Sequence, residues 1–378
     1  MAFTNVIKFS KESDTLCDGI KAYATEYLKN RKSIRSFQTF SGDEEKKKLI
    51  NGKFLKEVSR LSHVDFSNAN DKVSMKRIAT NPNVQYFANE IRDNMIDAIL
   101  PLLIDNSGIN AFTDIKYADL GDTIKFDLNS NNIFYVSRAG ERKRHGELQK
   151  SYRTTATMIG ENHELTVGTT LYEILSGESY IADEIVKVVL SIQNQMYIDV
   201  YNAFRAEVTN MSVYNASTWK TPLRATGTYS ETTAIEIAQR VQAYNGGAQP
   251  IFIGTSLALK NLIPKTSGGK YEFDSDFVKV GYLRDFNGFS ALALDQVANP
   301  TANNSTSQYN TLIPNNEIYI VTPTTDKICK LGVFGGTYSE TDRDPNANNS
   351  MFTTTSKHWE VKVCTNSVCG VLTSITQS

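Results

Sequence analysis

The sequence predicts an α+β protein of two or three domains. Its first 110 residues carry apolar side chains at helical spacing, whereas alternating, strand-like segments begin at Tyr117. Between these strands and a second strand-rich part lies one long stretch without glycine or proline, which predicts a single long helix. With 378 residues, 40% of them hydrophobic, the chain can bury more core than one small domain needs.

The N-terminal part predicts two amphipathic helices. The first spans Asp43–His63 beside a lysine run at 46–48, and the second begins at Pro82 after a capping Asn81 and ends before the breakers Pro101 and Gly108. Their apolar residues recur every three or four positions: Leu49, Ile50, Phe54, Leu55, Val58 and Leu61, then Val84, Phe87, Ile91, Met95 and Ile99. Because each helix is apolar on one side only, each needs a partner surface.

A long β-hairpin is predicted next. Segments 123–128, 133–138 and 151–159 alternate in polarity, with a turn at Asn129–Asn132. Residues 139–150 at the tip contain almost nothing apolar, so they cannot fold on a core of their own. The tip must therefore project into solvent or onto another molecule.

The longest helix is expected over residues 178–208. Ile181, Ile185, Val188, Ile192, Met196, Val200 and Phe204 recur there at helical spacing. At 1.5 Å per residue such a helix would be on the order of 45 Å long. Few compact domains need a rod of that length.

After Pro222 short elements alternate in type, which indicates an α/β domain. The expected elements are a helix at 234–243, a strand at 250–255, a short helix at 257–263 and strands at 290–297, 317–322 and 327–334. Two last strand-like segments, 354–365 and 367–376, meet at Asn366 and Ser367 and predict a closing hairpin by their spacing.

Composition and motifs argue against several classes of function. A net charge of −1 leaves no basic surplus with which to coat DNA, and no apolar run approaches the roughly 18 residues that span a bilayer. No export signal is visible, so we expect a cytosolic chain with Cys17, Cys329, Cys364 and Cys369 reduced. Neither a phosphate-binding loop, a nucleophile elbow nor a metal-binding histidine pair occurs, so we expect no enzyme, no cofactor and no metal site.

The order of these elements resembles the major capsid proteins of tailed bacteriophages, whose fold is named after phage Hong Kong 97 (HK97). The resemblance covers about residues 110–378, with local likeness in the strand PIFIGT and its following helix, in GYLRDFNGFSALAL and in EIYIVTP. It implies the following division: a helical N-terminal arm at 1–110, an extended hairpin called the E-loop at 111–167, a peripheral domain with a spine helix at 168–222 and 335–378, and an axial domain at 223–334.

The resemblance also implies a function. The chain would assemble as hexamers and pentamers into an icosahedral shell around double-stranded DNA, in the host cytoplasm, and would stay in the virion. Scaffolding, portal and decoration proteins are the further partners to expect. The basic residues of the E-loop tip would contact acidic groups on a neighbouring subunit: Arg138, Arg142, Lys143, Arg144 and Lys150.

Two alternatives stay open. An encapsulin-type compartment shares this fold but encloses cargo enzymes. A hydrolase or carbohydrate-binding protein of α/β type would fit the eighteen tyrosines and the long polar loops, although no nucleophile or paired-acid motif supports it.

Two further expectations concern assembly. The N-terminal helices either run as an arm beneath or between neighbouring subunits, which we favour, or pack within the subunit as a small accessory domain. We expect no covalent bond between chains, because nothing marks Lys143 or Lys150 as a desolvated lysine beside a glutamate.

Overall fold

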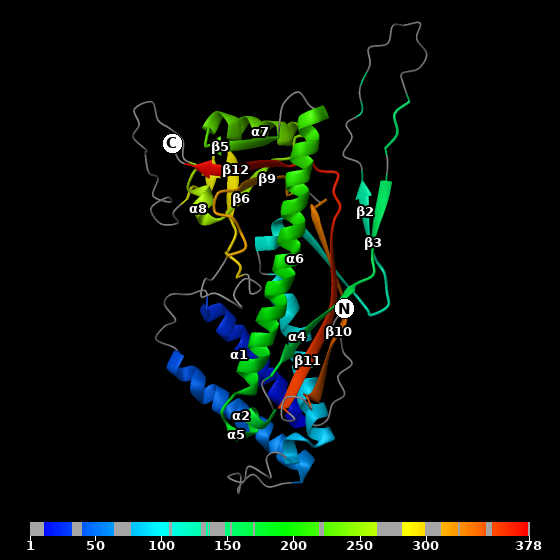
Figure 1. Ribbon diagram of the computed structural model, residues 1–378, viewed down its shortest axis with the longest axis vertical. Helices are drawn as coiled ribbons and strands as arrows, with labels where there is room; N and C mark the ends of the chain where they lie inside the picture. The colour runs from blue at the N-terminus through cyan, green and yellow to red at the C-terminus, as the bar shows by residue number, and fades with distance from the viewer. Residues whose placement is uncertain are drawn as a thin grey trace.

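The computed structural model shows an elongated subunit with the long helix α6 at its centre (Figure 1). It describes residues 11–31, 40–63, 77–105, 108–129, 134, 136, 148–151, 153–168, 171–218, 223–262, 282–298, 311–323, 326–344 and 350–376. Helices and strands both contribute heavily, so the α+β class is confirmed. Within the described part, no helix is both long enough and apolar enough to cross a bilayer.

Three helices form the N-terminal part: α1 (Lys11–Arg31), α2 (Phe40–Ser62) and α4 (Pro82–Asp105). Both expected helices are present, but the expectation that Pro101 ends the second one is wrong. Pro101 lies inside α4, which continues to Asp105. Ile104 in the last turn is 1% exposed, and its burial offsets the backbone hydrogen bond that the proline removes.

The apolar faces of these helices lie inside the subunit. Ile20, Phe54 and Phe87 belong to the same buried cluster as the core of α6, and the rings of Phe54 and Phe87 stack with centroids 6.0 Å apart. These apolar faces are thus buried within the subunit, and contact of the described helices with a neighbour stays a prediction. The hydrophobic surface that suggested a missing partner is satisfied by α6 and by the other two helices.

Helix α6 (Ile181–Thr218) confirms the expected spine and extends it to 38 residues, about 57 Å at 1.5 Å per residue. Its buried residues Ile185, Ile192 and Phe204 follow helical spacing. The short helices α5 (Leu171–Ser176) and η3 (Gly108–Ala111) lie in the chain on either side of the hairpin. As Figure 1 shows, α6 runs beside both halves of the molecule.

A four-stranded sheet lies alongside the spine, in the order β1, β10, β11, β4. The strands are β1 (Thr113–Ala118), β4 (Glu161–Val167), β10 (Cys329–Asp344) and β11 (Ser350–Val363). The long strands β10 and β11 are antiparallel, whereas β1 is parallel to β10 and ends opposite Phe334. Beyond Phe334, no strand of the described residues therefore pairs with β10 on that side.

A six-stranded sheet forms the other half, in the order β5, β12, β9, β6, β8, β7. Its strands are β5 (Arg224–Thr228), β6 (Ile251–Gly254), β7 (Asp285–Phe286), β8 (Phe289–Ala293), β9 (Ile318–Val321) and β12 (Gly370–Thr376). Helix α7 (Glu231–Tyr244) and the short α8 (Ser256–Leu259) pack into its core. The expected helix at 257–263 is thus one residue earlier at its start and shorter.

The predicted closing hairpin is wrong. β11 pairs with β10 and β4 in one sheet, whereas β12 pairs with β9 and β5 in the other. The link between them crosses from sheet to sheet, held by Asn245: its side chain accepts from the Val368 amide at 2.8 Å and donates to the Val368 carbonyl at 2.8 Å. Strand spacing predicts that two strands exist but cannot say which partners they choose.

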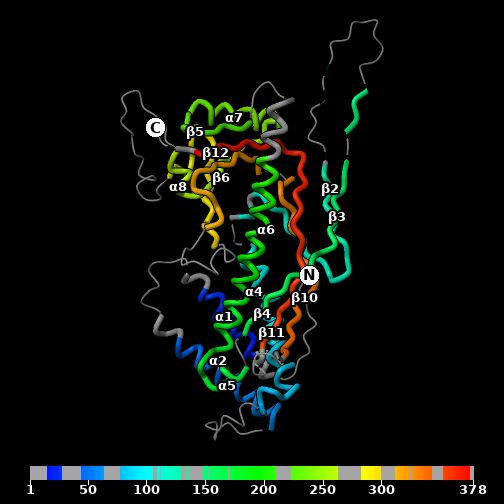
Figure 2. Tube along the Cα trace, viewed as in Figure 1, coloured from blue at the N-terminus to red at the C-terminus, as the bar shows by residue number. Residues whose placement is uncertain are grey.

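The long hairpin is confirmed at its root. β2 (Ile124–Asn129) and β3 (Arg153–Met158) pair antiparallel and stand apart from the two larger sheets (Figure 2). The expected turn beyond Asn129 and most of segment 133–138 lie outside the described residues. Of that segment, only Phe134 and Val136 are described, and neither belongs to a strand.

Candidate assembly interface

The hairpin root is fixed on the four-stranded sheet by a small apolar cluster. Ile124, Phe126 and Met158 pack against Phe334 of β10. Gly160, in the turn after β3, has a φ of +91°, and a Cβ there would lie 2.6 Å from the Phe334 ring. Only glycine fits this turn, because both the backbone conformation and the close approach exclude a side chain.

Polar contacts hold both strands of the root. Lys116 donates to the Lys125 carbonyl at 2.8 Å, and its ammonium lies 4.3 Å from the centre of the Phe126 ring. Glu360 of β11 accepts from the amides of Ile159 at 2.8 Å and Gly160 at 3.1 Å. Although burial alone would raise the pKa of Glu360, its bonds to Lys362 and to these amides hold it below the usual range. The hairpin thus leaves the body in one set direction.

The outer hairpin exposes apolar side chains. Phe134 is 54% exposed, Val136 88% and Leu148 86%. Of the predicted contact residues, Lys150 is described and exposed. The other four lie outside the described residues: Arg138, Arg142, Lys143 and Arg144. Their contact with a neighbour stays a prediction.

The free side of β10 is covered by helix α4 instead of by a strand. Asp93 accepts from the Ser339 amide at 3.0 Å, and Asp97 accepts from the Thr337 amide at 2.9 Å and hydroxyl at 2.6 Å. One turn earlier, Asn89 accepts from the Thr341 hydroxyl at 3.0 Å. Side chains four apart on the helix thus meet residues two apart on the strand, since both spacings are roughly 6 Å. We call these contacts the α4–β10 ladder.

Charges are buried in and near this ladder. The ammonium of Lys357, whose side chain is 6% exposed, lies 2.7 Å from Asp97 and also donates to the Gly335 carbonyl. Burial raises the pKa of Asp93 to about 6. Arg92 pairs with Glu184 at the start of α6, and burial raises the pKa of Glu184 as well. These groups fasten α4 to both the sheet and the spine.

A second polar contact joins the spine to the six-stranded sheet. Arg205 of α6 donates through two nitrogens to the carboxylate of Glu317, at 2.9 and 2.6 Å. The hydroxyls of Tyr201 and Tyr319 lie 2.9 Å apart in the interior. Burial would raise the pKa of Glu317, but the bonds from Arg205 and Tyr319 lower it below its usual range. The carboxylate is thus held ionised beside the first residue of β9.

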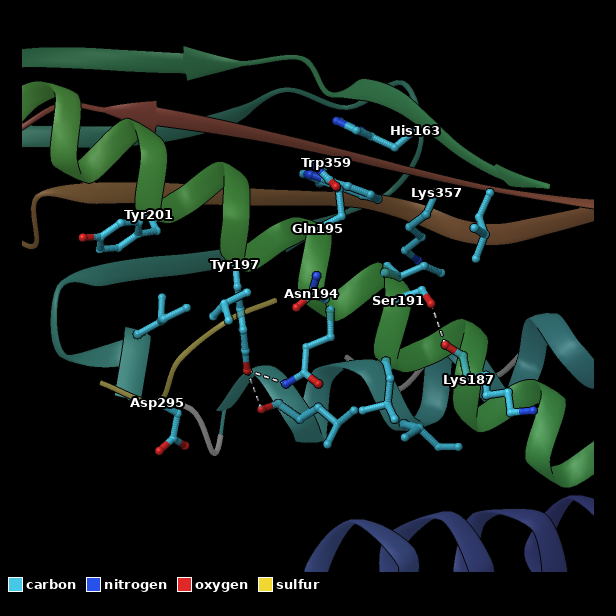
Figure 3. A pocket seen from close by; sticks show the side chains of 18 of the residues that line it. His163, Lys187, Ser191, Asn194, Gln195, Tyr197, Tyr201, Asp295, Lys357 and Trp359 are labelled. Carbon is cyan, nitrogen blue, oxygen red and sulfur yellow. Dashed lines mark hydrogen bonds between the residues drawn. The ribbon is translucent and has the colours of Figure 1, made fainter. Parts of the chain in front are cut away.

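A large open cavity lies between α6 and the four-stranded sheet, with a volume of about 1390 Å³. Figure 3 shows His163 and Trp359 on its sheet side and Lys187, Ser191 and Tyr197 along α6. The rings of His163 and Trp359 stack with centroids 3.7 Å apart, and the Trp359 indole donates to Asp199 at 2.9 Å. Four consecutive residues of β4, 162–165, line the cavity, so this strand borders it with its edge as well as with one face.

None of these features forms a catalytic or metal centre. Among the described residues, no group of three or more His, Cys, Asp or Glu side chains could hold a metal ion. Burial raises the pKa of Cys369 to about 12 and raises that of Cys329 further, which is the opposite of what a nucleophilic thiol needs.

Sequence reasoning missed the α4–β10 ladder and the cavity. A signal for the ladder exists: Asn89, Asp93 and Asp97 recur every four residues in a helix whose other side is apolar. Nothing in the sequence marks the cavity, because its lining comes from segments far apart in the chain.

Comparison with known families decides the identity. The family model described as "YonB: SPbeta prophage-derived putative capsid protein YonB" matches residues 19–373. The chain belongs to this capsid protein family. It is a structural protein of a phage capsid rather than an enzyme, which agrees with the expectation from its sequence. Among curated protein sequences, none matches the chain.

The chain is also similar in shape to solved structures from phages. One, titled "Microbacterium phage Oxtober96", is 10% identical, covers 72% of this chain and 91% of its own, and has a TM-score of 0.46. Another, from the "Satellite phage P4 procapsid including size determination (Sid) protein", is 7% identical, covers 75% and 91%, and also has a TM-score of 0.46. The family assignment rests on the family match and not on these scores.

Proposed function

We propose that this chain is the major capsid protein of a tailed phage, and that it assembles as hexamers and pentamers into an icosahedral shell of the HK97 type. The observation that carries the proposal is the hairpin: its root is fixed firmly on the sheet, whereas Phe134, Val136 and Leu148 beyond the root are exposed. Exposed apolar residues gathered on one element are typical of a surface that another molecule covers. Membership of a capsid family supports a second copy as that molecule.

The division of the subunit follows the two large sheets. We propose a peripheral domain built on α6 and on β1, β4, β10 and β11, with α1, α2 and α4 as part of its core. The axial domain would be the six-stranded sheet with α7 and α8, which takes β12 from the C-terminal end. The E-loop would be the part from β2 to β3. Relative to the boundaries that the sequence suggested, this moves β1 and β4 out of the E-loop, the start of β10 out of the axial domain and β12 out of the peripheral domain.

Further partners belong to the same proposal. Double-stranded DNA would lie against the inner face without specific contacts, which fits a chain with a net charge of −1. Assembly in the host cytoplasm, with scaffolding, portal and decoration proteins, is proposed on the same ground. We expect no covalent bond between chains, so denatured shells should give single chains on gels.

The test is the state of the purified full-length chain. We expect closed, uniform particles in negative-stain images and a matching mass by light scattering. A monomer under all assembly conditions would contradict the proposal. Particles from infected or induced cells that enclose a protein cargo in place of DNA would instead support an encapsulin-type compartment.

A further inference from the structure

The outer edge of strand β4 is open. β4 pairs with β11 on one side, and on its other side no strand pairs with it within the described residues. Its sequence, ENHELTV, contains neither proline nor lysine, and its register with β11 shows no bulge. Proteins usually protect an edge strand by one of these means, because an unprotected edge takes up a further strand.

The open cavity beside this edge, of about 1390 Å³, is wide enough to receive further side chains. Apolar residues of the lining include Leu165, Leu190 and Trp359. A strand added to β4 would place every second side chain over this lining, because alternate residues point to the same face.

The chain also contains a segment with the matching pattern. Residues 133–138, IFYVSR, begin with four apolar residues of strand-forming types, yet the described Phe134 and Val136 are exposed and belong to no sheet. Charge favours the same contact. The exposed residues of β4 include Glu161 and Glu164, whereas residues 133–153 contain six basic residues against two acidic ones.

We infer that segment 133–138 of one subunit adds as a fifth strand to the free edge of β4 in a neighbouring subunit, with Phe134 and Val136 in the cavity. The inference rests on the proposed function, since it needs a second copy of the chain. It specifies the mode of contact: backbone hydrogen bonds give the affinity, and two apolar side chains set the register.

Paired cysteines test the contact by its alternation. If Phe134 and Val136 face the cavity, Ser137 lies on the outer face, with Asn162, Glu164 and Thr166. We combine Ser137→Cys with a cysteine at each position from 162 to 166 in the full-length chain, and oxidise the assembled particles. The highest yield of disulfide-linked multimers should come from one of the even positions, 162, 164 or 166, whichever lies opposite Ser137. The yield at 163 and 165 should not exceed that of the single-cysteine variants.

The outcomes separate this inference from the proposed function. Single Ser137→Cys particles that close normally support a shell protein whatever the cross-linking shows. Normal particles without cross-links at any of the five positions, or with equal cross-linking at all five, reject strand addition and leave the shell intact. As a second measurement, Phe134→Ala should lower the temperature at which particles dissociate and leave the unfolding of unassembled subunits unchanged. An unchanged dissociation temperature argues against Phe134 as the anchor.

Discussion

The α4–β10 ladder and the outer hairpin differ in where their exposed groups find partners. Along β10 beyond Phe334, the amides of Thr337 and Ser339 would be unpaired, and Asp97 and Asp93 of the same subunit accept from them. Along the outer hairpin, Phe134 and Val136 are exposed, and no described part of the subunit covers them. The subunit thus pairs its own backbone groups along β10 but leaves apolar side chains of the hairpin exposed. We expect a neighbouring subunit to cover those side chains.

Mutations in the two regions should therefore have different effects. Changes on the ladder and in the helical core should destabilise the unassembled subunit. Changes on the outer hairpin should leave the subunit intact and affect only assembly.

The largest effect is expected in the helical core. Phe54→Ala removes a fully buried ring that stacks on Phe87, and should lower the free energy of unfolding of the subunit by about 3–5 kcal/mol. Leu49→Ala on the same helix, 61% exposed, is the matched control and should change it by less than about 0.5 kcal/mol. Urea unfolding of unassembled subunits measures both. Equal effects would mean that α2 is not part of the subunit core.

A somewhat smaller effect is expected at the centre of the ladder. Asp97→Ala leaves the buried Lys357 ammonium without its carboxylate and the Thr337 amide without its acceptor. We expect a loss of about 3 kcal/mol in the free energy of unfolding, since an unpaired buried charge is costly. Asp122→Ala, at an exposed aspartate, is the control. A loss below about 0.5 kcal/mol at Asp97 would show that α4 does not secure the edge of β10.

The ladder should also make the free energy of unfolding of the subunit depend on pH. Burial raises the pKa of Asp93 from 3.8 to about 6, so the folded state binds a proton more tightly than the unfolded chain does. This contribution to the free energy of unfolding is complete below about pH 4, is lost as the pH rises through about 6, and amounts to about 3 kcal/mol. Asp93→Asn should remove it. Denaturation of parent and variant across this range should give curves that diverge with pH, and parallel curves would count against a buried, protonated Asp93.

The smallest effect on stability is expected at the hairpin tip. Arg142→Glu, Lys143→Glu and Arg144→Glu together should change the free energy of unfolding by less than about 0.5 kcal/mol, because residues 139–150 contain almost nothing apolar that could pack on a core. Thermal unfolding of the unassembled triple variant checks this. A clear loss would mean that the tip packs on its own subunit.

Much of the fold could be predicted from the sequence because period and length are local properties. The spine α6, helices α2 and α4 and the hairpin root are all visible as regular apolar spacing. The strand with which another strand pairs is not determined by its local sequence. Strands β11 and β12 follow each other closely in the chain, yet a six-residue link directs them to different sheets, and only contacts such as Asn245 with Val368 determine that.

The same limit applies to the assembly interface. The basic tip was visible as charge without apolar residues, and it stays a prediction because Arg142, Lys143 and Arg144 lie outside the described residues. Asn89, Asp93 and Asp97 recur every four residues, but their partners on β10 lie 240 to 252 residues further along the chain, and the spacing alone does not indicate them. The one-sided N-terminal helices indicate that a partner surface exists but not where it lies, and α6 of the same chain covers part of their apolar surface.

The central claim is that the hairpin contacts a neighbour and not its own subunit, and particle formation by the tip variant tests it most directly. Light scattering and negative-stain images would compare the parent chain, the triple variant with Glu at 142, 143 and 144, and a control with Glu in place of the exposed Lys48, Lys53 and Lys56 on α2. We predict closed particles from the parent and the control, and only folded, unassembled subunits from the tip variant. Closed particles of normal size from the tip variant would contradict the account.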